Sequence, residues 1–434
     1  MKKSLITISM FVVISLGFVG ARLTSASYAT SEAIAAGSSW VDDFDSLTLD
    51  SRWFWVREDP SHWSLSANPG YLRITTQFGG LHLDSNDLKN LLVTAPSSQD
   101  FRIQTRVDFA PSENHHQAGL YVYQDDDNYI RLTRRYLDGS QQIRMYYEQN
   151  GLSITGFSID ETATSVYLRI DKEGDSYMGF YSTDGVHWEW VGQIIGNLSS
   201  PKVGLGAPGG ASLLEIPADF DFFDYQPLPL YNSTWVDGYN STPLLSHWSW
   251  VREDPTHWSL AANPGYLRIT TQEGGLFTDS NDMQNLLLTP VSSQDFRIQT
   301  RVDFSPSENH HSAGLFIYQD DDNYIQLVRR FFDPNQQIRF YYEENGVAMS
   351  SLTIDETATR VYLRIDKEGD SYMGFYSEDG IHWEWAGQII YSLLSPKVGI
   401  GARGGAALEE IPADFDFFGL SYTGHPIYLP LAVK

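Results

Sequence analysis

Alternating apolar and polar positions dominate the chain after its N-terminal segment. Phe101, Ile103 and Val107 alternate with Arg102 and Gln104, and shorter stretches at 143–147 and 167–171 repeat the pattern. Successive side chains of a β-strand point to opposite faces, so this alternation predicts strands with one buried and one solvated face. No later stretch sustains a 3.6-residue apolar period beyond two turns. The sequence therefore predicts an all-β protein.

Turn-forming pairs separate the predicted strands, among them Asn150-Gly151, Gly174-Asp175 and Asp184-Gly185. Glycine accepts positive φ angles and Asp or Asn side chains bond their own backbone, which favours tight connections. About a dozen short strands in roughly 190 residues are too many for one open sheet. Two antiparallel sheets packed face to face bury such strands, so we predict a jelly-roll β-sandwich.

The whole pattern occurs twice. Trp55 through Pro60 recurs as Trp250 through Pro255, and the same offset maps Gln124 onto Gln319 without a gap. About three quarters of the positions are identical between the copies, and a repeat this long is a complete domain rather than a solenoid unit. The predicted parts are a leader at 1–36, a first sandwich at 37–226, a Pro-rich linker at 227–234, a second sandwich at 235–422 and an apolar tail at 423–434.

The N-terminal segment has the features of a secretory signal peptide. Lys2 and Lys3 precede an apolar run from about Leu5 to Val19, and small residues follow as far as Ala36. A basic end, a short apolar core and small residues at the cleavage site are what the export machinery recognises. The alternative is a membrane anchor, but the run is shorter than the ~20 residues of a span. We expect a mature protein that is secreted or at the cell surface and has no membrane span.

The negative net charge of the chain disfavours some classes of binding partner. The 434 residues include 55 acidic side chains against 29 Lys and Arg, which gives a net charge of -26, and 14% of the residues are aromatic. A negative field repels phosphate backbones, so we expect no nucleic-acid partner. The chain has no cysteine, which excludes disulfides, thiolate metal sites and a cysteine nucleophile.

Three motifs carry a family resemblance: Trp-x-Trp-x-Arg-Glu-x-Pro at 53–60, Pro-Gly-Tyr-Leu-Arg-Ile at 69–74 and Gln-Asp-Asp-Asp-Asn-Tyr at 124–129. Each copy resembles the concanavalin A-like β-sandwich at the C-terminus of family 43 β-xylosidases, which also occurs alone in secreted bacterial proteins. The resemblance implies two tandem lectin-like jelly-roll sandwiches. It also implies that the glycoside-cleaving carboxylates of those enzymes lie on a separate five-bladed propeller, which this sequence does not contain.

Catalytic carboxylates are not evident in the sandwich sequences. Glycoside hydrolysis needs two carboxyl groups about 5–9.5 Å apart, whereas Glu58-Asp59 and Glu253-Asp254 are adjacent and would point to opposite faces of a strand. No Gly-x-Ser-x-Gly elbow follows a strand either. We predict no catalytic residues; a glycoside hydrolase or its accessory subunit is the alternative.

Arginine and aromatic side chains offer a candidate sugar site, because sugar C–H faces stack on aromatic rings and hydroxyls bond to guanidinium groups. Tyr121 and Arg131 are set aside, since the second copy has Phe316 and Gln326 there. Most tryptophans are assigned to the sandwich cores. The candidate ligand-binding residues are Arg57, Trp63, Tyr123, Tyr129, Arg135, Arg144 and Tyr146 in the first copy and Arg252, Trp258, Tyr318, Tyr324, Arg330, Arg339 and Tyr341 in the second.

Calcium has two candidate positions. Asp125-Asp126-Asp127-Asn128 either begins a calcium site or forms a tight turn, and the turn is favoured because Asp and Asn cap their own backbone. The resemblance further implies a structural calcium ion where the first and last strands meet. Its candidate ligands are Asp42, Asp219 and Asp221 in the first copy and Asp237, Asp414 and Asp416 in the second. No cofactor is expected to be required.

Together these patterns predict a secreted, non-catalytic tandem of sandwiches that binds extracellular polysaccharide or oligosaccharide, such as xylan-type chains. Two linked copies would raise avidity if both reach one polymer. A structural surface-assembly protein without glycan binding is a further interpretation.

Overall fold

The structure is a computed structural model that describes residues 38–228 and 231–423. The predicted signal peptide, and the apolar tail beyond Thr423, lie outside the described residues. Within them, the chain forms strands and turns only, and no helix is long and apolar enough to cross a membrane. The all-β prediction is confirmed.

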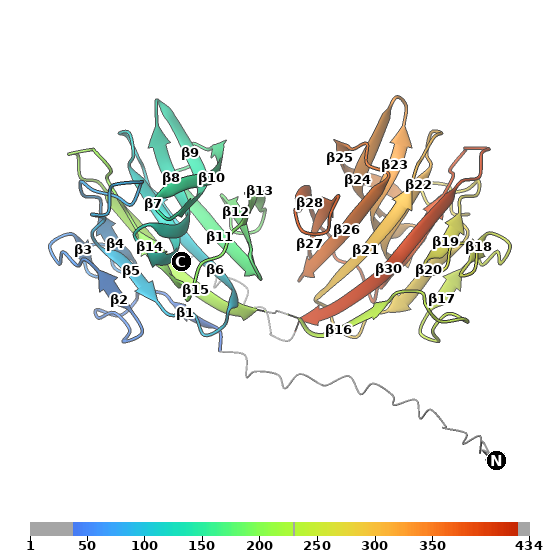
Figure 1. Cartoon of the computed structure of the whole chain (residues 1–434), viewed down its shortest axis with the longest axis horizontal. Helices are drawn as coiled ribbons and strands as arrows, with labels where there is room; N and C mark the ends of the chain where they lie inside the picture. The colour runs from blue at the N-terminus through green and yellow to red at the C-terminus, as the bar shows by residue number, and fades with distance from the viewer. Residues whose placement is uncertain (1–37, 229–230, 424–434) are drawn as a thin grey trace, which may run out of the picture. The chain divides into compact units, whose positions relative to one another are not determined.

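Each copy folds into two antiparallel sheets, as predicted for a sandwich (Figure 1). In the first copy the eight-stranded sheet has the order β13-β12-β11-β6-β15-β4-β3, with β1 paired to β15. Its strands are β1 (Trp40–Asp42), β3 (Trp63–Ser64), β4 (Leu72–Thr75), β6 (Asp100–Phe109), β11 (Ser165–Glu173), β12 (Ser176–Ser182), β13 (Glu189–Ile195) and β15 (Pro217–Leu228).

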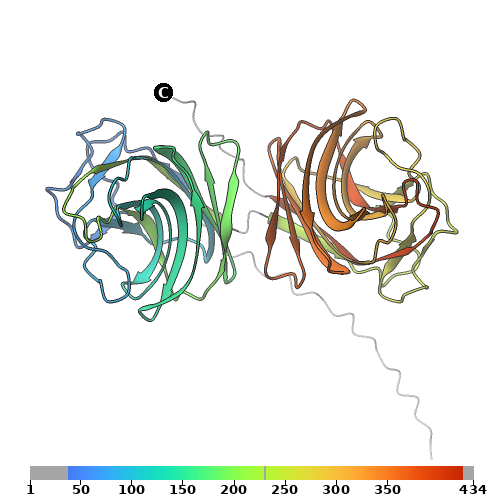
Figure 2. The same cartoon turned by 90° about the horizontal axis from the view of Figure 1, so that it is seen from above.

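The seven-stranded sheet of the first copy has the order β10-β9-β8-β7-β14-β5-β2. Its central strands β7 to β9 are strongly curved (Figure 2). The strands are β2 (Phe54–Val56), β5 (Leu91–Thr94), β7 (Gln117–Asp125), β8 (Asn128–Leu137), β9 (Ser140–Gln149), β10 (Leu152–Asp160) and β14 (Lys202–Gly206).

The second copy repeats this topology. Its sheets have the orders β18-β19-β30-β21-β26-β27-β28, with β16 beside β30, and β17-β20-β29-β22-β23-β24-β25. The strands are β16 (Tyr231–Asp237), β17 (Ser249–Val251), β18 (Trp258–Ser259), β19 (Leu267–Thr270), β20 (Leu286–Pro290), β21 (Phe296–Phe304), β22 (Ser312–Asp320), β23 (Asn323–Phe332), β24 (Asn335–Glu344), β25 (Val347–Asp355), β26 (Arg360–Glu368), β27 (Ser371–Ser377), β28 (Glu384–Ile390), β29 (Lys397–Arg403) and β30 (Pro412–Thr423).

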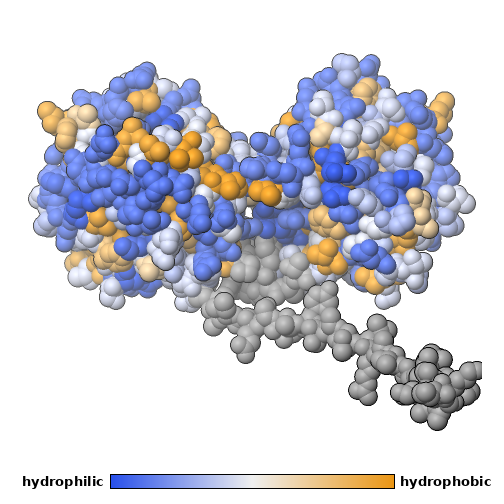
Figure 3. Space-filling model, viewed as in Figure 1, coloured by the Kyte–Doolittle hydropathy of each residue, from blue (hydrophilic) through white to orange (hydrophobic). Residues whose placement is uncertain are grey.

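The apolar core lies between the two sheets of each copy. Phe101, Ile103 and Val107 of β6 are completely buried, as their alternation predicted. Burying such side chains is the main favourable term in folding. On the visible surface, hydrophilic residues prevail and hydrophobic ones form small separate patches (Figure 3).

The segment at 124–129 forms a tight hairpin, as favoured by the sequence. β7 ends at Asp125 and β8 begins at Asn128. The Asp125 carboxylate accepts hydrogen bonds from the Asp127 backbone N–H at 3.0 Å and from the Asn128 side chain at 2.7 Å. The acidic side chain thus caps its own turn.

The connection between the copies is shorter than the sequence predicted. β15 continues through Pro227 and Leu228, where it pairs with β6, and β16 begins at Tyr231. Most of the expected linker at 227–234 therefore belongs to strands. Pro227 is tolerated there because proline lacks only a backbone donor and keeps an extended φ angle.

Charged residues join the two copies reciprocally within the compact unit that spans 36–434. Arg102 donates to Glu368 of the second copy at 2.8 and 2.7 Å. The equivalent Arg297 donates to Glu173 of the first copy at 2.7 and 2.8 Å. This exchange of equivalent partners is the pattern of an isologous interface.

An aromatic cluster lies in the same interface. The rings of Trp190 and Trp385 are parallel, with an interplanar angle of 2° and centroids 6.3 Å apart. Phe180 and Phe375, each 1% exposed, meet both rings edge to face. The assignment of most tryptophans to the cores therefore needs correction at these positions. Trp190 and Trp385 pack across the two copies, because they follow a hairpin at the outer edge of their sheets.

One partly buried carboxyl in the first copy predicts a pH-dependent stability change. Burial raises the pKa of Asp224 to about 6, although Gln226 and Gln104 donate to it at 2.9 and 3.3 Å. The ordinary unfolded value is about 3.9, so the ionised carboxylate destabilises the fold above pH 6 and this cost disappears between pH 6 and 4. We expect Asp224→Asn to raise the free energy of unfolding by about 1–2 kcal/mol at pH 8.

Urea denaturation at pH 8 and at pH 4 checks this expectation, with the wild type measured at both values. The gain should be largely lost at pH 4, where the native carboxyl is already protonated. An equal effect of the substitution at both pH values would contradict the assigned cause.

Candidate functional site

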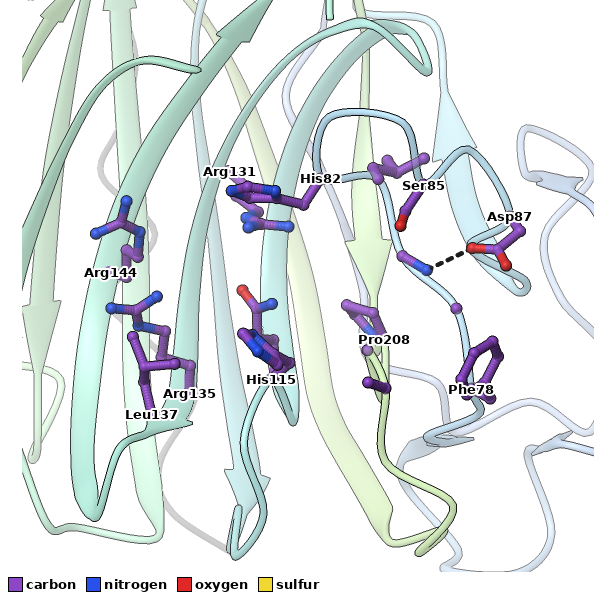
Figure 4. A pocket seen from close by; sticks show the side chains of 16 residues that line it. Phe78, His82, Ser85, Asp87, His115, Arg131, Arg135, Leu137, Arg144 and Pro208 are labelled. Carbon is purple, nitrogen blue, oxygen red and sulfur yellow. Dashed lines mark hydrogen bonds between the residues drawn. The ribbon is translucent and has the colours of Figure 1, made fainter. Parts of the chain in front are cut away.

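A cavity of about 430 Å³ opens on the outer face of the seven-stranded sheet in the first copy (Figure 4). Its size falls in the range typical of small-ligand sites. Strands β7, β8 and β9 form the floor, and the segments at 78–87 and 208–211 form the opposite wall. The lining residues are Phe78, Gly79, Gly80, Leu81, His82, Ser85, Asp87, His115, Gln117, Arg131, Arg135, Leu137, Arg144, Pro208, Gly210 and Ala211.

Three arginines on neighbouring strands supply the charge of this pocket. Arg131 and Arg135 lie on β8 and share one face because side chains alternate along a strand. Arg144 lies on β9 opposite Thr133, between the two positions on β8. Arg131 is 2% exposed and Arg135 is 9% exposed. The pleat of two paired strands therefore brings three guanidinium groups together.

The arginines are held without carboxylate partners. Arg135 donates to Gln142 Oε1 at 3.1 and 2.7 Å, and Arg144 donates to Ser158 Oγ at 3.1 Å. Arg131 lies 4.8 Å from the ring centre of Tyr146, and its Nε has no hydrogen-bond partner. Within 38–228 and 231–423, none of the three forms an ion pair with Asp or Glu.

Burial and mutual repulsion weaken the basicity of two of these arginines. Burial, together with Arg144 and Arg131, lowers the pKa of Arg135 to about 10. Burial and Arg131 also lower the pKa of Arg144. A pKa near 10 still leaves Arg135 protonated at neutral pH, so the pocket is cationic.

Aromatic surface lies beside the charges. The side chain of Phe78 is 58% exposed at the pocket wall. The ring of His82 stacks on Tyr146 with centroids 5.5 Å apart and an interplanar angle of 22°. Burial, followed by the Arg131 charge, lowers the pKa of His82, so this ring is neutral at pH 7. The pocket thus combines flat rings with guanidinium donors.

Two predicted ligand residues lie beneath the pocket. Tyr129 and Tyr146 are fully buried, and their hydroxyls donate to the Glu148 carboxylate at 3.2 and 2.9 Å. Glu148 also accepts from the backbone N–H of Leu83, and Tyr129 bonds the carbonyl of Leu81 at 2.5 Å. These tyrosines anchor the pocket wall. Their counterparts Tyr324 and Tyr341 bond Glu343 in the same way.

Arg57 and Tyr123 belong to another network. Arg57 makes two bonds of 2.8 Å to Asp126 and a third of 2.6 Å to the carbonyl of Leu88, while Tyr123 donates to Asp126 at 2.8 Å. This ion pair fixes the hairpin to the loop that precedes β5. In the second copy, Arg252 and Tyr318 bond Asp321 equivalently.

Trp63 lies at the edge of the other sheet, on β3, and does not line the pocket. Its indole N–H donates to Glu58 at 3.1 Å, and its ring packs 5.1 Å from that of Trp55. Trp258 donates to Glu253 at 3.2 Å in the same arrangement. Of the predicted first-copy residues, the pocket therefore brings together only Arg135 and Arg144.

The structure does not assemble the predicted calcium ligands. Asp42 accepts hydrogen bonds from the Phe44 backbone N–H at 3.0 Å and from the Trp53 indole at 2.8 Å. In the second copy, Asp237 accepts hydrogen bonds from the Tyr239 backbone N–H and the Trp248 indole. Among the described residues, no group of three or more His, Asp or Glu side chains is placed to hold a metal ion.

The remaining predicted ligands are paired with arginine. The carboxylate of Asp219 pairs with Arg73 at 2.6 Å, and Asp221 pairs with Arg106 at 3.4 Å. In the second copy, Asp414 pairs with Arg268 and Asp416 with Arg301. An arginine on the neighbouring strand thus reaches each of these four carboxylates. Calcium binding elsewhere in the protein stays a prediction.

The second copy also has three arginines, of which Arg330 and Arg339 are equivalent to Arg135 and Arg144 and the third comes from a different strand. Gln326 replaces Arg131, and Arg403 at the end of β29 replaces Pro208. Arg403 is 8% exposed and donates to Ser312 Oγ at 3.1 Å and to Gln326 Oε1 at 3.4 Å. The change to glutamine in the second copy excluded Arg131 from the predicted ligand residues. Only the fold shows that two exchanges 77 residues apart in the chain meet at one site.

Both copies of the repeat match one known protein family. Residues 41–226 and 236–421 each match the family described as the beta xylosidase C-terminal concanavalin A-like domain. The putative beta-xylosidase of Escherichia coli (strain K12) is 30% identical over 214 residues, which are 45% of this chain and 39% of that protein. The non-reducing end alpha-L-arabinofuranosidase BoGH43B of Bacteroides ovatus is 29% identical over 202 residues, which are 43% of this chain and 37% of that protein.

The chain thus spans about two fifths of the length of the curated relatives that it matches. Among solved structures, the GH43 BlXynB protein from Bacillus licheniformis aligns with a TM-score of 0.40 and 16% identity, over 85% of this chain and 74% of that one.

Proposed function

Because the chain belongs to the family of beta-xylosidase C-terminal concanavalin A-like domains, we propose that it is a secreted, non-catalytic protein that binds extracellular carbohydrate. The observation that carries this proposal is the pocket on the outer face of the seven-stranded sheet, where an exposed phenylalanine lies across the cavity from three arginines (Figure 4). An aromatic face accepts the apolar C–H side of a sugar ring, and guanidinium donors bond its oxygens.

The chemistry of the lining favours binding over cleavage. Glycoside hydrolysis uses two carboxyl groups on either side of the scissile bond. Asp87 is the one carboxylate among the lining residues, and it accepts the backbone N–H of Gly80 at 2.9 Å. Glu58, the other candidate carboxylate, accepts a hydrogen bond from the Trp63 indole and does not line the pocket.

The names of the relatives suggest the class of glycan. One is a putative beta-xylosidase and another an arabinofuranosidase, so pentose-containing polysaccharides such as xylan are the first ligands to test. Two copies on one chain would raise avidity for a long polymer if the sites of both copies reach it.

Substitution of the exposed aromatic rings tests this function. Phe78 is 58% exposed, and Phe277 of the second copy, 44% exposed, stacks on Tyr341 in the position of His82. We expect Phe78→Ala with Phe277→Ala to weaken binding to xylan or arabinoxylan about tenfold, because each loses a stacking surface. Affinity electrophoresis and isothermal titration measure the change. Arg52→Ala, which removes a cation outside the pocket, should bind like the wild type.

Other outcomes would contradict the proposal. A broad glycan array without signal, together with self-association, would favour a surface-assembly protein. If Trp63→Ala with Trp258→Ala weakened glycan binding and the phenylalanine substitutions did not, the binding site would lie at the sheet edges formed by β3 and β18. If the protein released reducing sugar steadily, and if Glu58→Gln with Glu253→Gln abolished this release, the protein would be a glycoside hydrolase.

A further inference from the structure

We propose that the arginine pocket of the first copy, and the corresponding arginine cluster of the second, recognise a carboxylate-bearing sugar, a uronic acid residue within a glycan. This inference rests on the proposed carbohydrate binding and names the class of sugar for the same site. It begins from the charge of the pocket floor, where Arg131, Arg135 and Arg144 gather without a carboxylate in a chain of net charge -26.

Burying cations without counter-ions is costly, so buried arginines are normally paired. The protein shows the normal case elsewhere: Arg102 and Arg169 are both buried and both bond Asp171. On the pocket floor, Arg131 is equally buried and lines open space, yet among the described residues no Asp or Glu forms an ion pair with it. A ligand anion would supply the missing partner.

The only carboxylate of the lining does not serve the arginines. Asp87 turns to the backbone of its own loop, where it bonds Gly80 (Figure 4). The same view shows the three arginines on one side of the pocket, with Phe78 and Pro208 on the other. The Glu148 carboxylate is satisfied by two tyrosines and a backbone N–H below the floor.

The two copies provide an independent observation. Where the first copy has Arg131 and Pro208, the second has Gln326 and Arg403, and Arg403 reaches the Gln326 side chain at 3.4 Å. The exchange moves a guanidinium from one wall of the site to the other while the number of arginines stays at three. A core-packing role would not require the charge to be kept. A role in binding an anion does require it.

A carboxylate carried by a sugar ring fits both the arginines and the aromatic rings of this site. It is planar and accepts two parallel hydrogen bonds from one guanidinium group. The rings of Phe78 and His82 are placed for the rest of the sugar, and so is the Phe277 ring in the second copy. The ligand that combines both features is a pyranose with a carboxyl group.

Isothermal titration with three xylotetraose derivatives tests the inference: one carries a single glucuronic acid branch, one the same branch reduced to glucose, and one a sulfate ester. We expect the full-length protein to bind the uronic acid derivative at least about tenfold more tightly than the reduced one, because a charge-assisted pair is lost on reduction.

Variants then assign the preference to the arginines. In an Arg403→Ala background, which weakens the second pocket, Arg131→Gln should abolish the preference of the first pocket for the acidic derivative. Adding Pro208→Arg to Arg131→Gln reproduces the arrangement of the second copy and should restore it. Thermal melting of each variant confirms that it folds, and a merely structural arginine would not be rescued from the opposite wall.

The outcomes separate this inference from the proposed function. Equal binding of the acidic and reduced derivatives would overturn the uronic acid assignment and leave carbohydrate binding intact. Tighter binding of the sulfate ester would overturn it in favour of another anion. Absence of binding to all three and to neutral xylan would overturn both proposals.

Discussion

Replacing Asp171 with alanine is expected to lower the free energy of unfolding of the first copy by about 3–5 kcal/mol, because two buried guanidinium groups lose one of the two carboxylates that they share and keep only Glu368 of the second copy. Asp171 is 8% exposed and accepts two bonds each from Arg102 and Arg169, at 2.5 to 2.9 Å. Burial alone would raise the pKa of Asp171, but the two arginines outweigh it and hold the pKa well below its ordinary value. The stabilisation is present above about pH 4 and is lost as the pH falls through the folded-state pKa.

Urea denaturation followed by tryptophan fluorescence measures this effect, and the unchanged second copy supplies an internal reference. Asp50→Ala is the matched control, since Asp50 also bonds an arginine, Arg52, but the side chains of that pair are 41% and 36% exposed. It should change the midpoint far less, because water replaces the lost partner at the surface. Similar midpoints for the two variants would show that burial of the Asp171 pair does not set its strength.

Gly204→Ala is expected to destabilise the first copy by about 3 kcal/mol or more, because the added methyl group has no room. Gly204 lies in β14 between β5 and β7, and a Cβ atom there would lie 1.9 Å from the Leu92 carbonyl oxygen. The colliding atom belongs to the backbone of the neighbouring strand, so relief requires the sheet itself to shift. Gly399 meets Leu287 at the same distance in the second copy.

Gly80→Ala is the control for this prediction. Apart from Gly80 itself and its two neighbours in the chain, no heavy atom lies within 4 Å of a Cβ atom at Gly80, and its φ angle is not in the left-handed region. Its free energy of unfolding should stay within about 0.5 kcal/mol of the wild type in the same urea titration. If Gly204→Ala also stayed within that range, the close approach of β14 and β5 would not restrict this position.

If the uronic acid preference holds, the two copies would reach one specificity through different arrangements. The first pocket places an exposed ring at Phe78, whereas the second has Glu273 there and a ring at Phe277. The third arginine is Arg131 on β8 in the first copy and Arg403 on β29 in the second, so it lies on a different wall of the site. Such differences would let the copies accept differently branched segments of one polymer, with the tandem arrangement providing avidity.

The sequence by itself determined the strands, the repeat and the sandwich. These follow from local rules: the two-residue period of Phe101, Ile103 and Val107 reports burial on one face, and Asp125 caps its own turn whatever lies around it. It also identified Arg135 and Arg144 as candidate ligand residues, since both lie on the polar faces of predicted strands.

Tertiary structure alone decided which polar residues meet. Arg57 is an equally good candidate in the sequence, yet in the structure it forms an ion pair with Asp126. Tyr129 donates to Glu148 and lies beneath the pocket instead of lining it. The exchange of Arg131 for Arg403 across one pocket, and the packing of Trp190 against the other copy, join residues far apart in the chain. The reason is physical: a strand's period fixes the face on which a side chain lies, but its partners depend on how sheets and loops are brought together in space.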